Sequence, residues 1–142
     1  MKLYIAGPLF NEMERSRNEE ITSMVEATGI DTYLPQRDGG VFSQMLERGM
    51  NIEQVRHQIF KEDVEAIETS DGILCLLDGR VPDEGMCVEL GIAYALGKQC
   101  TGYRTDSRVS ESEGMNIILE GCLEKVFTNK KELLEFLLNT KC

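Results

Sequence analysis

The sequence has no tryptophan, one histidine and three prolines, and its 15 basic residues are outnumbered by 25 acidic ones. The resulting net charge of −10 argues against a nucleic-acid-binding surface, because a phosphate backbone attracts basic residues. No apolar stretch approaches the length of a membrane span, and no polybasic run is present to dock on anionic lipid. We therefore expect neither nucleic acid nor a membrane as a partner.

The spacing of the cysteines indicates neither a set of disulfides nor a metal site. The cysteines are odd in number and stand apart at positions 75, 87, 100, 122 and 142, without a C-x-x-C pair. Such spacing provides no metal-ligand motif and is typical of free thiols. The apolar part of the N-terminus is too short for a signal peptide, and Pro8 interrupts it. These features favour a reducing, cytoplasmic location.

Several common catalytic motifs are also missing. The sequence contains no G-x-G-x-x-G after its first strand, no P-loop and no G-x-S-x-G elbow. The first strand ends without the acidic residues that a phosphoacceptor receiver domain requires. The single histidine, His57, lies on the flank of an amphipathic helix, and we interpret it as a partly exposed helix residue. Dinucleotide binding, P-loop chemistry and serine hydrolysis are therefore disfavoured.

The apolar residues that are present alternate between strand and helix patterns along one domain, residues 1–142. Strands are expected at 2–6, 31–35, 72–77, 99–104 and 124–127. Helices are expected at 11–28, 52–70, 83–98, 115–122 and 131–140, and the Gly-rich segment up to about residue 50 is expected to be irregular. Strands separated by helices imply right-handed crossovers. The pattern predicts an α/β, flavodoxin-like three-layer sandwich whose five parallel strands follow the order 2-1-3-4-5.

One carboxylate interrupts the expected helix at 83–98. Between Gly85 and Gly97 every residue is apolar or small except Glu89. A buried ionised carboxylate without a partner costs several kcal/mol, roughly. Glu89 must therefore pair with a cation, reach solvent or face a ligand cavity at the mouth of the sheet. We favour the cavity, since Gly85 permits close approach at the start of the helix.

Two further acids support a site at this position. Asp63 lies between Ile59 and Ile67 on the apolar stripe of the expected helix at 52–70, although an ion pair with Arg56 is an alternative. Asp83 precedes Glu89 in a loop, where aspartate is usually a turn former. Clustered carboxylates without a metal motif or phosphate loop favour glycosyl chemistry. In such chemistry one carboxylate attacks the anomeric carbon and a second acid protonates the leaving group.

Segments along nearly the whole chain resemble the nucleoside 2-deoxyribosyltransferases. They are "YIAGPLF", "EDVEAIETSDGILCLLDG", "PDEGMCVELGIAYALGK" and "MNIILEG", in the family's order. The third is the most specific, since it combines an acid, a glycine and Glu-Leu-Gly at fixed spacing. The resemblance implies an enzyme that transfers a 2-deoxyribosyl group between purine or pyrimidine bases in nucleoside salvage. It also implies two displacements with retention, no metal or organic cofactor, and a homo-oligomer.

The resemblance further implies a role for each matching residue. Glu89 would form the covalent deoxyribosyl ester, and Asp83 would exchange a proton with the base. Asp63 would hold the sugar or orient Glu89, and Tyr4 would restrain Glu89. The residues implied to bind substrate are Gly7, Pro8, Phe10, Gly85 and Asn116.

Two of these substrate-binding roles are more specific. Phe10 is expected to lie against the base, and Asn116 is expected to serve the site of a neighbouring subunit. The loop "PQRDGG" and the chain end "LLNTKC" differ from family patterns, so the residues do not fix the base preference or how the pocket is closed.

Two alternatives are left open by the residues. A hydrolase of 2'-deoxynucleoside 5'-monophosphates would need a phosphate pocket, and Arg15, Ser16 and Arg17 near the start of the first helix are candidates. The glutamates around them favour a solvated helix face instead. A non-catalytic nucleoside- or nucleotide-binding module would bind the same ligands without turnover.

Overall fold

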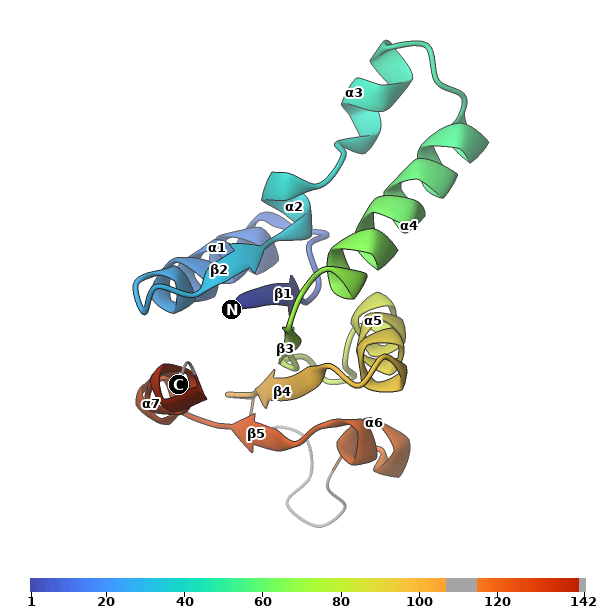
Figure 1. Ribbon diagram of the computed structural model, residues 1–142. Helices are drawn as coiled ribbons and strands as arrows, with labels where there is room; N and C mark the ends of the chain where they lie inside the picture. The colour runs from blue at the N-terminus through green and yellow to red at the C-terminus, as the bar shows by residue number, and fades with distance from the viewer. Residues whose placement is uncertain (107–114, 141–142) are drawn as a thin grey trace.

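A five-stranded parallel sheet forms the centre of the protein (Figure 1). The computed structural model describes residues 1–106 and 115–140. The strand order is β2-β1-β3-β4-β5, which confirms the predicted topology. The strands are β1 (Lys2–Ala6), β2 (Asp31–Tyr33), β3 (Gly72–Leu76), β4 (Gln99–Tyr103) and β5 (Lys125–Phe127).

Helices cover both faces of this sheet and complete the three layers. They are α1 (Glu12–Glu26), α2 (Pro35–Asp38), α3 (Phe42–Glu47), α4 (Ile52–Glu68), α5 (Glu84–Ala95), α6 (Ile117–Cys122) and α7 (Lys130–Thr140). One apolar cluster joins α1 and α7 to the sheet, and a second joins α4, α5 and α6 to its opposite face. The two faces therefore carry separate cores, and the candidate site belongs to the second.

Local sequence accounts for the main elements. Every residue of β3 is buried, as a continuous apolar run in a doubly covered strand requires. Both α1 and α4 begin with a capping box, formed by Asn11 with Glu14 and by Asn51 with Gln54. Gly29 adopts a φ of 77° just after α1, a conformation that favours glycine and ends the helix.

The segment between β2 and α4 differs from its prediction. It was expected to be irregular, but it contains α2, with Pro35 in its first turn, and α3. These helices span four and six residues, too few to produce a recognisable apolar period. Helix α3 and the first turns of α4 form an arm that projects from the body of the protein, and α2 lies at its base (Figure 1). The other elements agree with their predicted positions apart from small differences at their ends.

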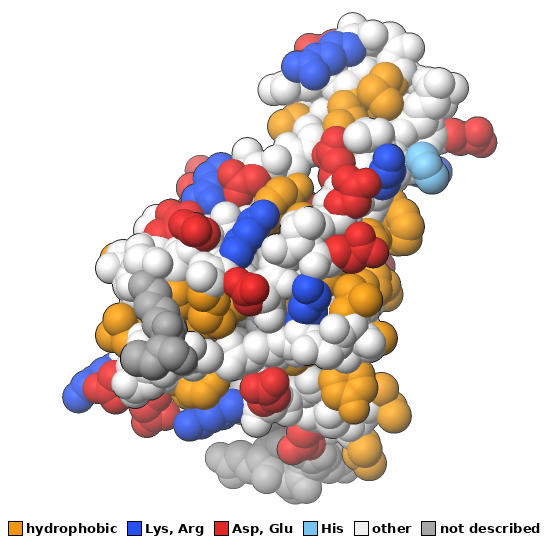
Figure 2. All heavy atoms as spheres, viewed as in Figure 1, with side chains coloured by type: hydrophobic (Ala, Val, Ile, Leu, Met, Phe, Trp, Pro, Cys, Tyr) orange, Lys and Arg blue, Asp and Glu red, His pale blue; other side chains and the backbone are white. Residues whose placement is uncertain are grey.

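The described part of the chain holds no helix that is both long enough and apolar enough to cross a membrane. On the face drawn in Figure 2, acidic and basic side chains are interspersed over the upper body of the protein. Apolar side chains gather on the same face over α5 and α6. We call the exposed residues Val88, Tyr94, Ile117 and Ile118 the apolar patch.

Candidate active site

Tyr4 and Glu89 meet on the face of the sheet that α4 and α5 cover. Tyr4 is a β1 residue whose fully buried side chain belongs to the apolar core under these helices. Glu89 lies in the second turn of α5, and its Oε1 accepts a hydrogen bond of 2.6 Å from the Tyr4 hydroxyl. The strand and the helix thereby hold the carboxylate from two directions.

Glu89 has the polar partner that its apolar surroundings require, but that partner is not a cation. No lysine or arginine in the described ranges forms an ion pair with Glu89 or Asp63. Burial raises the pKa of Glu89 to about 7, the Tyr4 hydrogen bond opposes this rise, and the charges of Asp63 and Asp83 add to it. Glu89 is thus an acid that changes charge near neutral pH.

Asp63 joins the pair from the middle of α4. Burial raises its pKa to about 6, the charge of Glu62 adds to the rise, and a hydrogen bond with Tyr4 lowers it. Burial and the two carboxylates also raise the pKa of Tyr4 far above its usual value, so its hydroxyl stays protonated and donates. We call Tyr4, Asp63 and Glu89 the acid cluster.

Asp83 caps the helix that carries Glu89. Its Oδ2 accepts a hydrogen bond of 2.9 Å from the backbone N–H of Met86 at the start of α5. A Cβ added at Gly85 would lie 3.1 Å from the same oxygen, so a larger residue there would crowd the cap. The turn-forming interpretation of Asp83 is therefore correct as far as it goes, and its charge still acts on Glu89.

The loop after β1 follows the strand that carries Tyr4 and leads to α1. A Cβ at Gly7 would lie 3.0 Å from the Leu76 Cβ, so glycine permits the close approach of β1 and β3 at their ends. The Pro8 carbonyl accepts a hydrogen bond of 2.9 Å from Asn18 on α1. The Phe10 side chain is 76 % exposed, and its contact with a base stays a prediction.

Asn116 caps α6 with its side chain. Its Oδ1 accepts hydrogen bonds from the backbone N–H groups of Ile118 at 2.9 Å and Leu119 at 3.4 Å. A small cavity of about 190 Å³ lies beside it, between the loop after β3 and the start of α6. The residues that line this cavity are Leu77, Arg80, Val81, Pro82, Arg104, Met115, Asn116 and Leu119.

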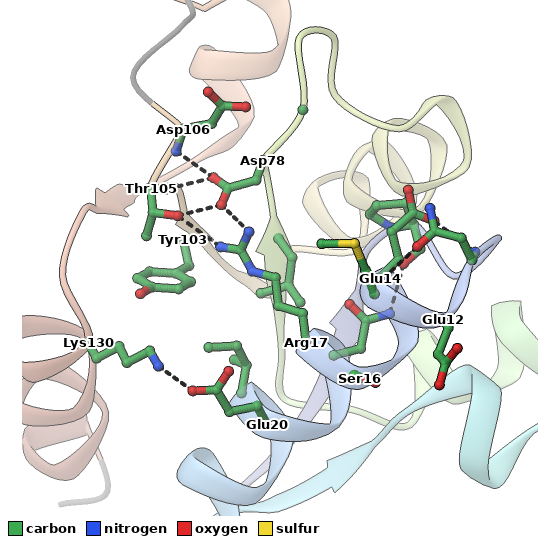
Figure 3. A pocket seen from close by; sticks show the side chains of 17 residues that line it. Glu12, Glu14, Ser16, Arg17, Glu20, Asp78, Tyr103, Thr105, Asp106 and Lys130 are labelled. Atoms are coloured by element: carbon green, nitrogen blue, oxygen red, sulfur yellow. Dashed lines mark hydrogen bonds and ion pairs between the residues drawn. The ribbon is translucent and has the colours of Figure 1, made fainter.

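A larger cavity, of about 1070 Å³, lies on the opposite face, between α1 and the ends of β3 and β4 (Figure 3). None of the acid cluster lines it. Asp78 is one of its lining residues, and it forms an ion pair with Arg17 and accepts hydrogen bonds from Thr105 and from the backbone N–H of Asp106. Burial would raise the pKa of Asp78, but these partners outweigh it and lower the pKa.

The sequence analysis did not single out Asp78. An acid just after a buried strand is nevertheless a usable signal, because it is expected to lie at the carboxyl ends of the strands. His57 is exposed on α4, which confirms its interpretation as a surface helix residue. Within residues 1–106 and 115–140, no group of three or more His, Cys, Asp or Glu side chains is arranged to hold a metal ion.

The nucleoside 2-deoxyribosyltransferase family model matches residues 3–131. The chain belongs to this family. The matched range includes the acid cluster, Asp83 and Asn116, so the family resemblance found in the sequence is confirmed.

The chain is also similar to individual known proteins, in sequence or in fold. The nucleoside deoxyribosyltransferase of Limosilactobacillus fermentum is 28 % identical over 110 residues, which are 68 % of this chain and 61 % of the relative. A 2-deoxyribosyltransferase from Bacillus psychrosaccharolyticus has the same fold, with a TM-score of 0.76, 23 % identity and coverage of 94 % and 90 % of the two chains. A CMP N-glycosidase from Clostridium botulinum also shares the fold, with a TM-score of 0.62, 19 % identity and coverage of 96 % and 98 %.

Proposed function

We propose that this protein transfers a 2-deoxyribosyl group between nucleobases through a covalent ester on Glu89. The observation that carries the proposal is the unpaired charge of this carboxylate. A hydroxyl at 2.6 Å orients Glu89, and no cation in the described ranges neutralises it. An acid used only for stability would be paired, because an uncompensated buried charge is costly.

The reaction proceeds in two balanced displacements. In the first, a Glu89 oxygen bonds to the anomeric carbon of a 2'-deoxynucleoside as the bond to the base breaks, and Asp83 gives the departing base its proton. In the second, an incoming base returns a proton to Asp83 and displaces the ester, so the product keeps the original configuration. General acid catalysis of this kind contributes about 10²–10⁴-fold.

The acid cluster suits an electron-deficient transition state. The developing oxocarbenium ion is positive, and Glu89, Asp63 and Asp83 surround it with negative charge. A 2'-hydroxyl would withdraw electrons and raise this barrier, which favours 2-deoxy sugars as substrates. Asp63 holds the sugar or orients Glu89, while Tyr4 restrains the nucleophile and stabilises its charged form.

The remaining site residues shape the pocket. Gly7, Pro8 and Gly85 keep the walls close to the backbone, and Phe10 covers the base once substrate is bound. We also propose a cytoplasmic location, which the four free cysteines among the described residues support. Neither a metal nor an organic cofactor takes part in the proposed steps.

A neighbouring subunit completes the site in this proposal. The apolar patch supports an oligomer, since Ile117 and Ile118, next to Asn116, are 84 % and 77 % exposed. Asn116 would then reach the site of the neighbour. Mixing Glu89→Gln protein with Asn116→Ala protein should restore activity that neither variant has alone. Absence of restored activity in a mixture shown by mass spectrometry to exchange subunits would refute the shared site.

Trapping the ester tests the central claim. Incubation with a 2-fluoro-substituted deoxynucleoside, followed by peptide mass mapping, should place the sugar on the peptide that contains Glu89. An adduct on another residue would refute the assignment. A protein that binds the compound without any adduct, and turns over no substrate, would be the binding module instead.

The hydrolase alternative can be distinguished from the transferase by the products of the reaction. Ser16 and Arg17 line the larger cavity, but Arg17 is paired with Asp78, and Arg15 donates to the Leu9 carbonyl at 3.1 Å. Both guanidinium groups are thus engaged, which disfavours a phosphate site. Deoxyinosine with adenine should yield deoxyadenosine. Turnover of only a deoxynucleoside 5'-monophosphate, to base and sugar phosphate, would establish the hydrolase and exclude the transferase.

A further inference from the structure

Tyr33 lies beside Tyr4 on the neighbouring strand. The β1–β2 register places the two tyrosines directly opposite each other. Their rings are stacked, with centroids 5.6 Å apart and planes inclined by 16°. Tyr33 is half-buried and packs against the same apolar core as Tyr4. The ring that carries the Glu89-binding hydroxyl therefore has an aromatic wall on its β2 side.

Within the part of the chain that the structure describes, β2 is the sheet's one lateral support for Tyr4 on the side away from β3. The order β2-β1-β3-β4-β5 makes β2 an edge strand, so no further strand of residues 1–106 and 115–140 lies beyond Tyr33. On the other side Tyr4 is opposite Ile73 of β3, whose branched side chain is fully buried. The Tyr4 ring is held between Ile73 and Tyr33, and only the latter stands at an open edge.

We propose that Tyr33 is a positioning residue for the transfer reaction, because its ring fixes the plane of Tyr4 and thereby the Tyr4 hydroxyl on Glu89. This inference rests on the proposed function, since it assigns Tyr33 a role in orienting the proposed nucleophile. A small tilt of the Tyr4 ring would move its hydroxyl out of the 2.6 Å contact. Misplacement of a reacting group by about 1 Å can reduce a rate by about 10²-fold.

The aromatic ring, rather than the hydroxyl of Tyr33, performs this role. The hydroxyl donates no hydrogen bond to a residue in the described ranges, and a Cβ at Gly39 would lie 3.1 Å from it. The Lys2 ammonium lies 5.6 Å from the centroid of the Tyr33 ring, a further contact with the π-system. Phenylalanine at this position would retain the stack, whereas an aliphatic residue would remove it.

Kinetics of three variants test the role of the ring. We expect Tyr33→Phe to keep kcat within about twofold, and Tyr33→Leu to lower kcat by about 10-fold with little change in KM. Tyr33→Met retains more volume and takes the place of Tyr33→Leu if the latter does not fold. Tyr103→Leu is the matched control, because Tyr103 is buried on the opposite face and contacts none of the acid cluster. It should reduce stability without the selective loss of kcat.

A double-mutant cycle separates positioning from a general structural effect. If Tyr33 acts through the Tyr4 hydroxyl, Tyr33→Leu should cost little further kcat once Tyr4→Phe has removed that hydroxyl. Additive losses, or a Tyr33→Phe variant as slow as Tyr33→Leu, would overturn the proposal. The folded fraction of each variant is measured by circular dichroism, and kcat is expressed per folded enzyme.

A third measurement, the titration of the Glu89 carboxyl, does not depend on catalytic turnover. The Tyr4 hydrogen bond lowers the pKa of Glu89, so loosening it should raise the titration midpoint of the Glu89 carboxyl, followed by ¹³C NMR. The midpoint should rise in Tyr33→Leu and not in Tyr33→Phe or Tyr103→Leu. The other titratable or charged groups around the acid cluster and Tyr33 are Lys2, Asp38, Glu62, Cys75 and Asp83.

The two proposals can fail independently. An unchanged Glu89 midpoint in folded Tyr33→Leu protein would overturn the role of Tyr33, whatever the enzyme catalyses. If the midpoint moves but wild-type protein forms no ester on Glu89, the proposed function is wrong and the positioning of the carboxyl by Tyr33 still holds.

Discussion

Glu89 and Asp78 are acids near the same end of the strands, but they lie on opposite faces of the sheet. Their electrostatic surroundings are also opposite. Asp78 forms an ion pair with Arg17 and accepts several hydrogen bonds around Thr105, and its pKa is lowered. Glu89 accepts one hydrogen bond from the residues that the structure describes, from Tyr4, and its pKa is raised to about 7 by burial and by neighbouring acids.

The difference shows how one sheet can carry a paired acid on one face and an acid without a cationic partner, the proposed nucleophile, on the other. The partners of Asp78 stabilise its charge and fix the ends of β3 and β4 to α1. The neighbours of Glu89 leave its charge uncompensated, which costs stability and leaves the charge free to act on a substrate. Substitutions at the two positions should therefore have opposite consequences for activity and for stability.

The largest expected effect is on turnover. Glu89→Gln should lower kcat by about 10⁴-fold or more, as loss of a nucleophile does. Asp78→Asn should keep kcat within about threefold per folded enzyme, because Asp78 lines the larger cavity, which none of the acid cluster lines. Base exchange between deoxyinosine and adenine, followed by liquid chromatography, measures both. Equal losses of kcat in the two variants would contradict the distinction between the roles of Glu89 and Asp78.

The next effect is a loss of stability at the paired acid. Asp78→Asn should reduce the free energy of unfolding by about 2 kcal/mol at pH 7, since charge-assisted hydrogen bonds and an ion pair are lost. A lowered folded-state pKa means that this stabilisation is present above the unfolded value of 3.8 and disappears as the pH falls through the folded value. Urea unfolding at pH 7 and pH 3 tests both statements. An equally large difference at pH 3 would show that the charge is not responsible.

A smaller effect of opposite sign is expected at Glu89. Glu89→Gln should raise the free energy of unfolding by about 1–2 kcal/mol at pH 8, because it removes a charge from a buried site. A raised folded-state pKa makes wild type most stable below the unfolded value of 4.5, and this advantage is lost as the pH rises through about 7. The gain from the substitution should therefore shrink toward pH 4.5. A variant less stable than wild type at pH 8 would refute the charge argument.

The smallest effect is a shift of the pH–rate profile. The acid limb of kcat/KM should lie near the pKa of about 7 of Glu89, whose ionised form is the proposed nucleophile. Tyr4→Phe should move the limb up by about 0.5–1 pH unit, and Asp63→Asn should move it down by a similar amount. Asp78→Asn provides the unshifted control. Shifts in the same direction for the first two variants would be inconsistent with the described contacts.

Much of this molecule could be predicted from local pattern. The apolar run of β3 and the alternation of strands and helices predicted the correct topology. The isolated acid in α5 singled out Glu89, whose catalytic role stays a prediction. Helices α2 and α3 could not be predicted in this way, because they are too short to show a period. Asp78 was missed because its partners, Arg17 and Thr105, are distant in sequence.

The sequence by itself determined the family, the order of the strands and the identity of the acids, because these follow from residue spacing along the chain. The tertiary structure decided which acid is paired and which is not. That distinction depends on a hydroxyl from β1 reaching α5 and on a guanidinium from α1 reaching the end of β3. Coulombic and hydrogen-bond energies depend on the distance between groups and on their burial. The spacing of residues along the chain determines neither the distance nor the burial.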